Sequence, residues 1–367
     1  MKHMKSPFSN PFLGAFCAAV LATSGWALAQ EEAAPPAGEA GGDAAAAAEA
    51  PAAPAVPVKP RPSDVLPLAS KGLLLDVSNT GKHFVAVGTR GTILLSNSGL
   101  HTEWAQVQAP VRSPLTSVYF ADQQNGWVVG HDAVILHTTD GGTSWKLQNF
   151  QPELEKPFLD VLFTDASTGF AVGAYGLFYK TTDGGNNWAQ VDAPAIRQDE
   201  LHFNSIAKLG NGNLFIAGEQ GMLGISTDGG NTWEKLASPY EGSYFGVLPV
   251  GEAGALIYGL RAHIYVTQNA KTGPWKQVDT KSVVSLFGGT LLPDGRAALV
   301  GINGTILLVD PASGAVREQR VKIREKDKIG IEREKIIASS LSSAVPLDGN
   351  GLLLVGEEGV RTTALVQ

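Results

Sequence analysis

Short apolar stretches alternate with turn-forming residues along most of the chain, and the helical spacing of apolar residues does not compete with this pattern. One unit illustrates it. Leu115 to Ala121, Gly126 to Gly130, Val134 to Thr138 and Trp145 to Gln148 each favour a strand, with Gly, Asp and Asn concentrated between them. The pattern predicts an all-β fold of small four-stranded sheets.

The unit recurs, and each copy contains a strand of small and β-branched residues that ends in glycine. These glycines are Gly88, Gly130, Gly173, Gly218, Gly259, Gly301 and Gly356. Their separations are 42, 43, 45, 41, 42 and 55 residues. A period near 40 to 45 residues with several short strands is typical of propeller blades. We therefore predict a seven-bladed β-propeller.

Three units share a turn of the form Thr-Thr-Asp-Gly-Gly-x-x-Trp, at Thr138 to Trp145, Thr181 to Trp188 and, in a close variant, Ser226 to Trp233. Paired glycines permit positive φ, the aspartate can accept backbone N–H groups, and the tryptophan offers a large apolar anchor. This motif resembles the Asp-box, or BNR repeat, of other propellers, where it is a structural fastener. The resemblance implies a structural role for Asp140, Trp145, Asp183, Trp188, Asp228 and Trp233.

The last unit ends near Leu365 without an outer strand, and an exposed sheet edge invites aggregation. We expect Asp64 to Leu68 to close the ring as the missing strand. The charged insertion at about 317–335 holds eight basic and five acidic residues. Val316 to Ile323 can serve as the sixth outer strand, and Glu325 to Lys335 is expected to be a projecting loop or short extra hairpin. Charge runs are usually solvated, and binding of the partner by this charged loop is the alternative that stays open.

The N-terminal region is expected to direct export. Lys2 and Lys5 precede an apolar stretch from Phe12 to Ala22 and a small-x-small sequence ending at Ala29, which together predict a cleaved signal peptide over residues 1–29. Residues 30–62 are rich in Ala, Pro, Gly and Glu and predict a disordered tether. Residues 63–367 are the propeller, which we expect to be periplasmic and associated with the membrane through a partner.

Charge and motif content exclude several classes of function. The net charge is −7 and becomes −9 when the signal and its two lysines are removed, which disfavours nucleic acid as a partner. The histidines lack metal-ligand spacing, and Cys17 lies within the signal. Nucleophile-elbow, Walker A and dinucleotide-binding motifs are missing from the sequence. We expect no catalytic residue, metal, cofactor or small-molecule substrate.

The turns between the second and third strands occupy equivalent positions but differ in chemistry, which suggests side chains adapted to a ligand. The candidate partner-binding residues of this turn ring are Arg90, His131, Asp132, Tyr175, Gln220, Arg261 and Asn303. On the same face the blade connections add Arg112, Glu155, Lys156, Arg197, Tyr240, Tyr244 and Lys281. Arg and Tyr are favoured in protein interfaces. Loops also vary because they are free to vary, and that alternative stays open.

With its repeats, its signal and strands such as Phe170 to Gly173 and Trp127 to Gly130, the chain resembles the Ycf48/Hcf136 family. The resemblance implies a seven-bladed propeller without enzymatic activity. Photosynthetic members assemble photosystem II at the lumenal side of the membrane, and a basic patch is thought to carry that role. No contiguous arginine cluster here matches that patch. Relatives in other bacteria often accompany resistance-nodulation-division (RND) exporters.

These features lead us to expect a non-enzymatic periplasmic scaffold that binds an integral membrane protein complex on its exported side, with an RND-type transporter as one candidate partner. Two other functions stay open. A sialidase-like glycoside hydrolase would share the Asp-boxes, although the Arg-Ile-Pro motif of sialidases is missing. A glycan-binding propeller would use exposed aromatic residues such as Tyr175 and Tyr240.

Overall fold

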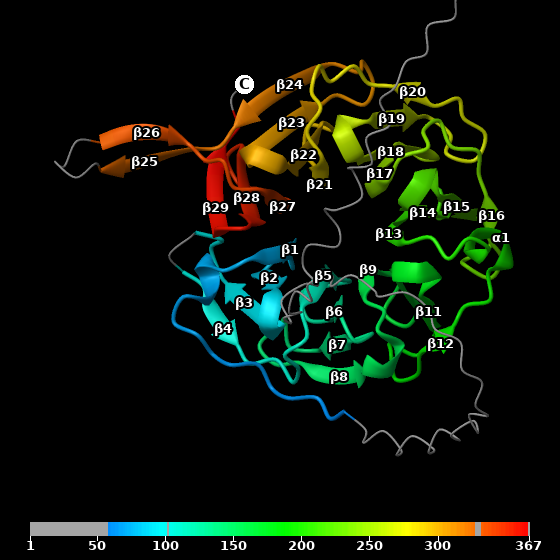
Figure 1. Ribbon diagram of the computed structural model, residues 1–367, viewed down its shortest axis with the longest axis horizontal. Coiled ribbons are helices and arrows are strands. Elements are labelled where there is room, and N and C mark those ends of the chain that lie inside the picture. Colours follow the sequence, from blue (N-terminus) through cyan, green and yellow to red (C-terminus); the bar gives the residue numbers. More distant parts are fainter. Residues whose placement is uncertain (1–57, 101–102, 327–331, 366–367) are drawn as a thin grey trace, which may run out of the picture. The chain divides into compact units, whose positions relative to one another are not determined.

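The protein is described here by a computed structural model that covers residues 58–100, 103–326 and 332–365. These residues form a ring of seven small antiparallel sheets, confirming the seven-bladed β-propeller (Figure 1). The expected signal peptide, residues 1–29, and residues 30–57 of the expected tether lie outside the described residues. Within the described ranges, no helix has the length and apolarity needed to cross a membrane.

The first four blades each have four strands in sequence order from the centre outward. Blade one consists of β1 (Leu74–Asn79), β2 (Phe84–Gly88), β3 (Thr92–Ser96) and β4 (Ala105–Val107); blade two of β5 (Leu115–Phe120), β6 (Gly126–Gly130), β7 (Ile135–Thr138) and β8 (Lys146–Asn149); blade three of β9 (Phe158–Phe163), β10 (Gly169–Gly173), β11 (Phe178–Thr181) and β12 (Ala189–Gln190); blade four of β13 (Phe203–Lys208), β14 (Leu214–Gly218), β15 (Leu223–Ser226) and β16 (Glu234–Lys235).

The remaining blades follow the same order, and the seventh has three strands among the described residues. Blade five consists of β17 (Tyr244–Val250), β18 (Gly254–Gly259), β19 (Ile264–Thr267) and β20 (Lys276–Gln277); blade six of β21 (Leu286–Leu291), β22 (Ala297–Gly301), β23 (Thr305–Val309) and β24 (Val316–Arg320); blade seven of β27 (Leu341–Leu347), β28 (Gly351–Gly356) and β29 (Gly359–Ala364). The connections contain the helix α1 (Pro194–Arg197) and the 3-10 helices η1 (Ala69–Lys71) and η3 (Pro152–Leu154).

The core of the propeller lies between the blades, because each sheet buries both faces against its neighbours. Seven clusters of buried apolar side chains fill the seven interfaces between adjacent blades. At the seam between the first and last blades, Leu74 and Val77 pack with Leu353 and Val355. The Ser342 hydroxyl also donates to the Leu74 carbonyl across this seam, at 2.6 Å. Face-to-face packing therefore joins the two ends of the ring.

The repeated glycines have a steric cause that the structure makes plain. A Cβ atom on Gly130 would lie 2.1 Å from the carbonyl oxygen of Pro114, which immediately precedes the inner strand of the same blade. The other six glycines meet the equivalent carbonyl at 2.0 to 2.3 Å. Because any side chain would force the strands apart, the glycine recurs once in every blade.

The predicted closing strand does not form. Residues Asp64 to Leu68 belong to no sheet, and η1 follows them at Ala69–Lys71. The blue segment instead passes along the outer rim of blade one towards blade two (Figure 1), where the Ser63 N–H donates to the Ala109 carbonyl at 2.9 Å. Polar side chains of the β4–β5 connection satisfy its backbone, so it is held beside blades one and two.

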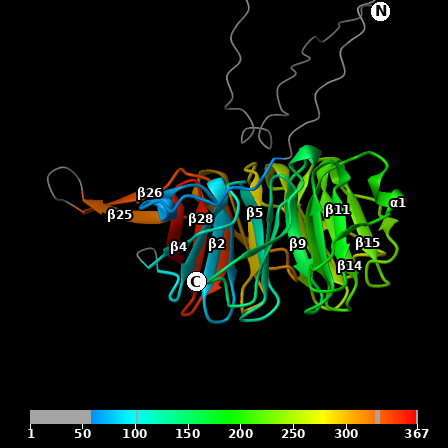
Figure 2. The same cartoon turned by 90° about the horizontal axis from the view of Figure 1, so that it is seen from below.

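The charged insertion is divided between the sixth blade and a separate hairpin. Val316–Arg320 forms the outer strand of blade six, slightly shorter than predicted. β25 (Lys322–Lys326) and β26 (Glu332–Ile336) then pair antiparallel as a two-stranded hairpin that projects from the ring (Figures 1 and 2). Of the two forms expected for this insertion, the short hairpin is the one that occurs.

Candidate functional site

The turns between second and third strands share one backbone conformation. In blades one, three, four, five and six they form the 3-10 turns η2 (Thr89–Gly91), η4 (Ala174–Gly176), η5 (Glu219–Gly221), η6 (Leu260–Ala262) and η7 (Ile302–Gly304). The middle residue of each has a left-handed conformation, with φ between 50° and 59°. The turn of blade two forms no 3-10 helix, but Asp132 and Ala133 have the same pair of positive φ angles that Arg261 and Ala262 have in blade five. Blade seven turns through Gly359, with φ 74°.

Left-handed backbone is unfavourable for residues with a Cβ atom, so these turns need outside support. The next blade connection supplies it. The Gly221 N–H donates to the Gly242 carbonyl at 2.9 Å, and the Gly176 N–H donates to the Leu201 carbonyl at 3.0 Å. A Cβ atom on Gly91 would lie 2.1 Å from the Val111 carbonyl oxygen. Close packing against the following connection therefore fixes the turn, leaving the middle side chain free to differ.

Five predicted residues of the turn ring are exposed and carry different chemistry. They are Arg90, Tyr175, Gln220, Arg261 and Asn303. The Tyr175 ring is 49% exposed, stands edge-on to His202 at 4.7 Å, and has the Lys156 ammonium 5.7 Å from its centroid. The structure thus presents an aromatic ring, cations and amides from neighbouring blades on one face of the propeller.

The other two predicted residues are half-buried and engaged within the protein. Asp132 accepts a short hydrogen bond from the Ser113 hydroxyl, and the His131 N–H donates to the Pro114 carbonyl at 2.9 Å. Burial lowers the pKa of His131, against an opposing effect of Asp132, so the neutral ring is favoured. These two residues stabilise their own turn more than they extend the exposed surface.

Tyr244 was expected to add to the same face, and that expectation is wrong. Its side chain is 0% exposed, and its hydroxyl lies 3.0 Å from Ser238 Oγ. It begins an inner strand at the position that Leu115, Phe158 and Phe203 occupy in other blades, where the side chain packs between sheets. Tyr240 is half-buried and stacks on His263 at 4.0 Å, which leaves Tyr175 as the exposed aromatic residue of this face.

The Asp-box turns join third and fourth strands, so they lie at the opposite end of each blade from the turn ring. Asp140 Oδ1 accepts the Ser144 N–H at 2.9 Å and the Thr138 hydroxyl at 2.7 Å. Asp183 and Asp228 make the equivalent bonds in the next two blades. Although burial opposes it, hydrogen bonds from Ser144 and Thr138 hold the pKa of Asp140 below its ordinary value.

The tryptophans of these turns pack between blades. Trp145 is 7% exposed, and its indole N–H donates to the Gly142 carbonyl at 3.1 Å. Trp188 donates to the Gln148 side chain at 3.3 Å, and Trp233 is 8% exposed within the core between blades three and four. The aspartate fixes the turn, and the tryptophan joins it to the core.

A polar cluster at the centre of the ring was missed by sequence reasoning. Asp76 and Asp160 lie on inner strands on either side of Ser117, whose hydroxyl oxygen is 3.2 Å from one carboxylate and 3.0 Å from the other. Asp76 also accepts the Val118 N–H at 2.8 Å, and Asp160 accepts the Ile206 N–H at 2.9 Å. These bonds link blades one to four.

The Ser117 hydroxyl has one hydrogen, so it can donate to Asp76 or to Asp160 but not to both at once. Both carboxylates are also buried, and burial disfavours their charged forms. Burial raises the pKa of Asp160 to about 6. The nearby charge of Asp76 raises it further, whereas the hydrogen bond from the Ile206 N–H lowers it. Burial likewise raises the pKa of Asp76.

A signal for this cluster existed in the sequence. Every inner strand carries a β-bulge at the same place, and the residue after it is Asp76, Ser117, Asp160, Ser205, Gly246, Gly288 or Ser343. Each of these lies 12 or 13 residues before the repeated glycine of its blade. Alignment of the repeats on that glycine would have shown the small and acidic residues in register.

The described residues offer no group of three or more His, Cys, Asp or Glu side chains that could hold a metal ion. The central carboxylates are held by N–H groups and hydroxyls. These hydrogen bonds join inner strands of neighbouring blades.

Comparison with known proteins identifies the family. The model described as "Photosynthesis system II assembly factor YCF48" matches residues 95–155 and 148–322. Over 91 residues, 22% of this chain and 21% of the relative, the chain is 33% identical to the chloroplastic photosystem II stability/assembly factor HCF136 of Oryza sativa subsp. japonica. Over 46 residues, 12% of this chain and 13% of the relative, it is 33% identical to the photosystem II assembly protein Ycf48 of Thermosynechococcus vestitus. The chain thus aligns with 21% and 13% of the lengths of these two curated relatives.

Solved structures agree with this fold over most of the chain. A structure described as "YCF48 bound to D1 peptide" aligns with a TM-score of 0.62 at 18% identity. The alignment covers 86% of this chain and 99% of the chain in that structure. YCF48 from Cyanidioschyzon merolae has a TM-score of 0.61 at 19% identity and covers 82% of this chain and 97% of its own. Assembly factors of the Ycf48 family are non-enzymatic, so the family match favours a scaffold over the sialidase-like alternative. The repeats, the seven blades and the family match together show that this chain belongs to the Ycf48/HCF136 family of β-propellers.

Proposed function

We propose that the protein is a non-enzymatic scaffold that binds an integral membrane protein complex through its turn ring. The observation that carries this proposal is the contrast between a uniform turn backbone and exposed side chains that differ from blade to blade. A surface that only closed each blade would need no such variety. Tyr175 and Arg261 have the chemistry that protein interfaces favour.

The class of ligand is a polypeptide segment. A structural relative is described as bound to a D1 peptide, and a ring of arginine, tyrosine and amide side chains suits backbone carbonyls and mixed side chains. The signal expected at residues 1–29 supports a periplasmic location, with the partner contacted on its exported side. Within this proposal, an RND-type transporter is the more specific candidate partner.

Crosslinking in living cells of the native host tests the proposal. A tagged wild-type chain is expected to recover one integral membrane protein after mild solubilisation, and the double variant Tyr175→Ser, Arg261→Ser is expected to lose it. The matched control is the double variant Lys82→Ser, Lys146→Ser, which changes two exposed lysines outside the turn ring. The control should retain the partner.

Two outcomes would contradict the proposal. Recovery that is equal in all three proteins would place the interface elsewhere on the propeller. Recovery of no membrane protein, combined with thermal stabilisation by a glycan, would favour the glycan-binding alternative, because a ligand that binds only the folded state raises its apparent stability.

A further inference from the structure

Exposed apolar side chains are concentrated in one short segment. Of the eight large apolar residues that are exposed in the described part of the chain, four lie within residues 58–68. They are Val58 at 66% exposure, Val65 at 60%, Leu66 at 42% and Leu68 at 66%. Single exposed apolar residues are ordinary on a soluble protein, but a cluster of them marks an interaction surface.

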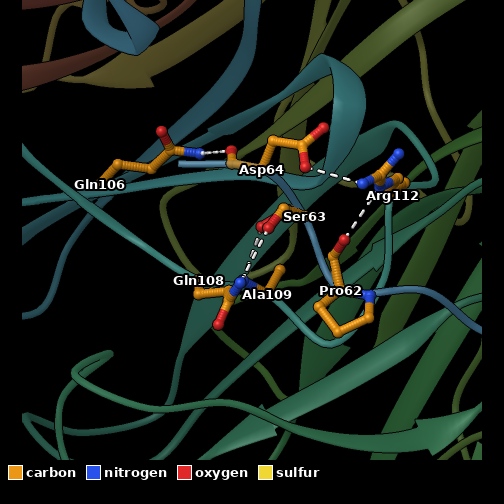
Figure 3. Close-up of polar contacts among 7 residues, drawn as sticks. All are labelled: Pro62, Ser63, Asp64, Gln106, Gln108, Ala109 and Arg112. Carbon is orange, nitrogen blue, oxygen red and sulfur yellow. Dashed lines mark hydrogen bonds and ion pairs between the residues drawn. The ribbon is translucent and has the colours of Figure 1, made fainter. Parts of the chain in front are cut away.

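This segment, which we call the rim segment (residues 58–68), is held against the propeller by its polar groups. Figure 3 shows the contacts: Ser63 exchanges two bonds with the Ala109 backbone at 2.9 Å, and the Gln106 side chain donates to the Asp64 carbonyl at 2.8 Å. The guanidinium of Arg112 donates to the Pro62 carbonyl at 3.0 Å and to the Asp64 carboxylate at 2.7 Å.

These contacts use the backbone of the rim segment and the side chains of Ser63 and Asp64, and Ser63 is 1% exposed. The Leu66 N–H donates to the Gln106 side chain at 2.7 Å, so the backbone is held where the apolar residues begin. The side chains of Val65, Leu66 and Leu68 are left pointing away from the core. A fixed backbone lowers the entropy cost of using these side chains in binding.

Cations flank the apolar residues along the sequence although the protein as a whole is acidic. Lys59 and Arg61 lie within the rim segment, Lys71 follows it, and all three are exposed. A hollow of about 300 Å³ is lined by Asp64, Leu66, Arg90 and Arg112. Asp64 balances Arg112, whereas the Arg90 guanidinium makes no ion pair or hydrogen bond with any residue in 58–100, 103–326 or 332–365. An anionic group would satisfy it.

We propose that the rim segment and Arg90 form a docking site for an anionic lipid surface. A headgroup phosphate would lie in the hollow beside Arg90, and Val65, Leu66 and Leu68 would enter the boundary between headgroups and acyl chains. Exposed apolar side chains beside cations are the combination that interfacial binding requires. An apolar helix of a protein partner would need an apolar groove, whereas the hollow here is lined mainly by charged residues.

This inference goes beyond the proposed function, because it assigns the rim segment, together with Arg90 at the edge of the turn ring, to lipid and not to protein. The tether was expected over residues 30–62, so the rim segment overlaps the end of the tether and continues into the propeller. A lipid contact at this place would hold blades one and two against the membrane while the turn ring engages a protein.

Vesicle co-sedimentation tests the proposal with the protein purified as its host processes it. We expect the wild type to sediment with vesicles that contain phosphatidylglycerol, to do so less at high salt, and to stay in solution with pure phosphatidylcholine. The triple variant Val65→Ser, Leu66→Ser, Leu68→Ser should bind anionic vesicles about tenfold or more weakly. Arg90→Glu should weaken binding without changing the melting temperature.

The matched control is the double variant Leu100→Ser, Val283→Ser, which removes two exposed apolar side chains outside the rim segment and should bind like the wild type. The proposal is overturned if the wild type ignores anionic vesicles, or if the triple variant binds them as well as the control. Loss of a crosslinked membrane protein in the triple variant, without any lipid binding by the wild type, would identify the rim segment as a protein interface instead. The Tyr175 and Arg261 variant should keep its lipid binding, which separates this test from that of the proposed function.

Discussion

Each blade has tight turns at both of its ends, and the two kinds are held by different means. In an Asp-box turn such as Thr138 to Trp145, side chains of the turn itself accept and donate the bonds that fix the backbone. In the turn ring, η5 is fixed by the carbonyl of Gly242 from the following connection. A turn fixed by its own side chains must keep its sequence, whereas a turn fixed by its neighbours can vary at its exposed position.

The largest test of this comparison is a pair of alanine substitutions at glycines with positive φ. Gly91 has φ 67° and would place a Cβ atom 2.1 Å from the Val111 carbonyl, whereas Gly229 has φ 74° and nothing within 4 Å of that atom. We expect Gly91→Ala to lower the free energy of unfolding by about 3 kcal/mol or more and Gly229→Ala by about 1 kcal/mol. Urea denaturation measures both. Equal losses would show that the neighbouring connection does not constrain the turn ring.

A second test compares the carboxylates of the Asp-boxes with those of the ring centre. The folded pKa of Asp160, about 6, lies above its unfolded value of 3.8, so the folded state binds more protons between these limits. The contribution of Asp160 to stability is therefore present at low pH and is lost as pH rises through about 6, by up to about 3 kcal/mol. The pKa of Asp140 is lowered, so its contribution is lost only as pH falls below about 4.

Unfolding midpoints in urea between about pH 4 and pH 7 measure this contribution, because the folded and unfolded states differ in protonation of Asp160 only between its two pKa values. We expect the Asp160→Asn variant to lose the part of the pH dependence that the wild type owes to this carboxylate. His131 and His137, whose pKa values burial lowers, favour the folded state as pH rises. The histidines are the same in the wild type and in Asp160→Asn, so subtracting one pH dependence from the other cancels the contribution of the histidines. A pH dependence that is the same in both proteins would contradict the assignment.

The smallest expected changes in the free energy of unfolding come from removing one side chain from an Asp-box turn and one from the turn ring. Asp140→Ala removes the carboxylate that accepts Thr138 and Ser144, and should cost about 1 kcal/mol. Gln220→Ala keeps the left-handed backbone and removes an exposed side chain, so the change should be below about 0.5 kcal/mol. Thermal melting of both variants is sufficient. A larger loss at Gln220 would mean that its side chain supports its own turn.

The sequence allowed the blades to be predicted because their constraints repeat. Gly130 and its six equivalents are needed wherever a strand end approaches the inner strand, so the period is visible without any structure. The rim segment was misplaced because its position depends on Gln106 and Arg112, which lie about 40 or more residues away and occur in one blade alone. Pattern reasoning detects what is repeated and misses a contact made once.

The candidate site was predicted in part for the same reason. Arg90 and Tyr175 were placed correctly on exposed turns because the repeat register locates every turn. Tyr244 was misjudged because the exact start of an inner strand decides whether a side chain faces solvent or core. Asp76 and Asp160 gave no sign of a shared site when each blade was read separately. The site is formed only when blades one and three bring both carboxylates to the Ser117 hydroxyl of blade two.

The seam between the first and last blades has a consequence for synthesis. Leu74 and Val77 are among the first core residues to leave the ribosome, and their partners Leu353 and Val355 follow almost three hundred residues later. One apolar face of the first blade therefore stays exposed until translation is nearly complete. Ribosome stalling or premature termination late in the message would leave that face open to chaperones, proteases and aggregation, although six blades had already been made.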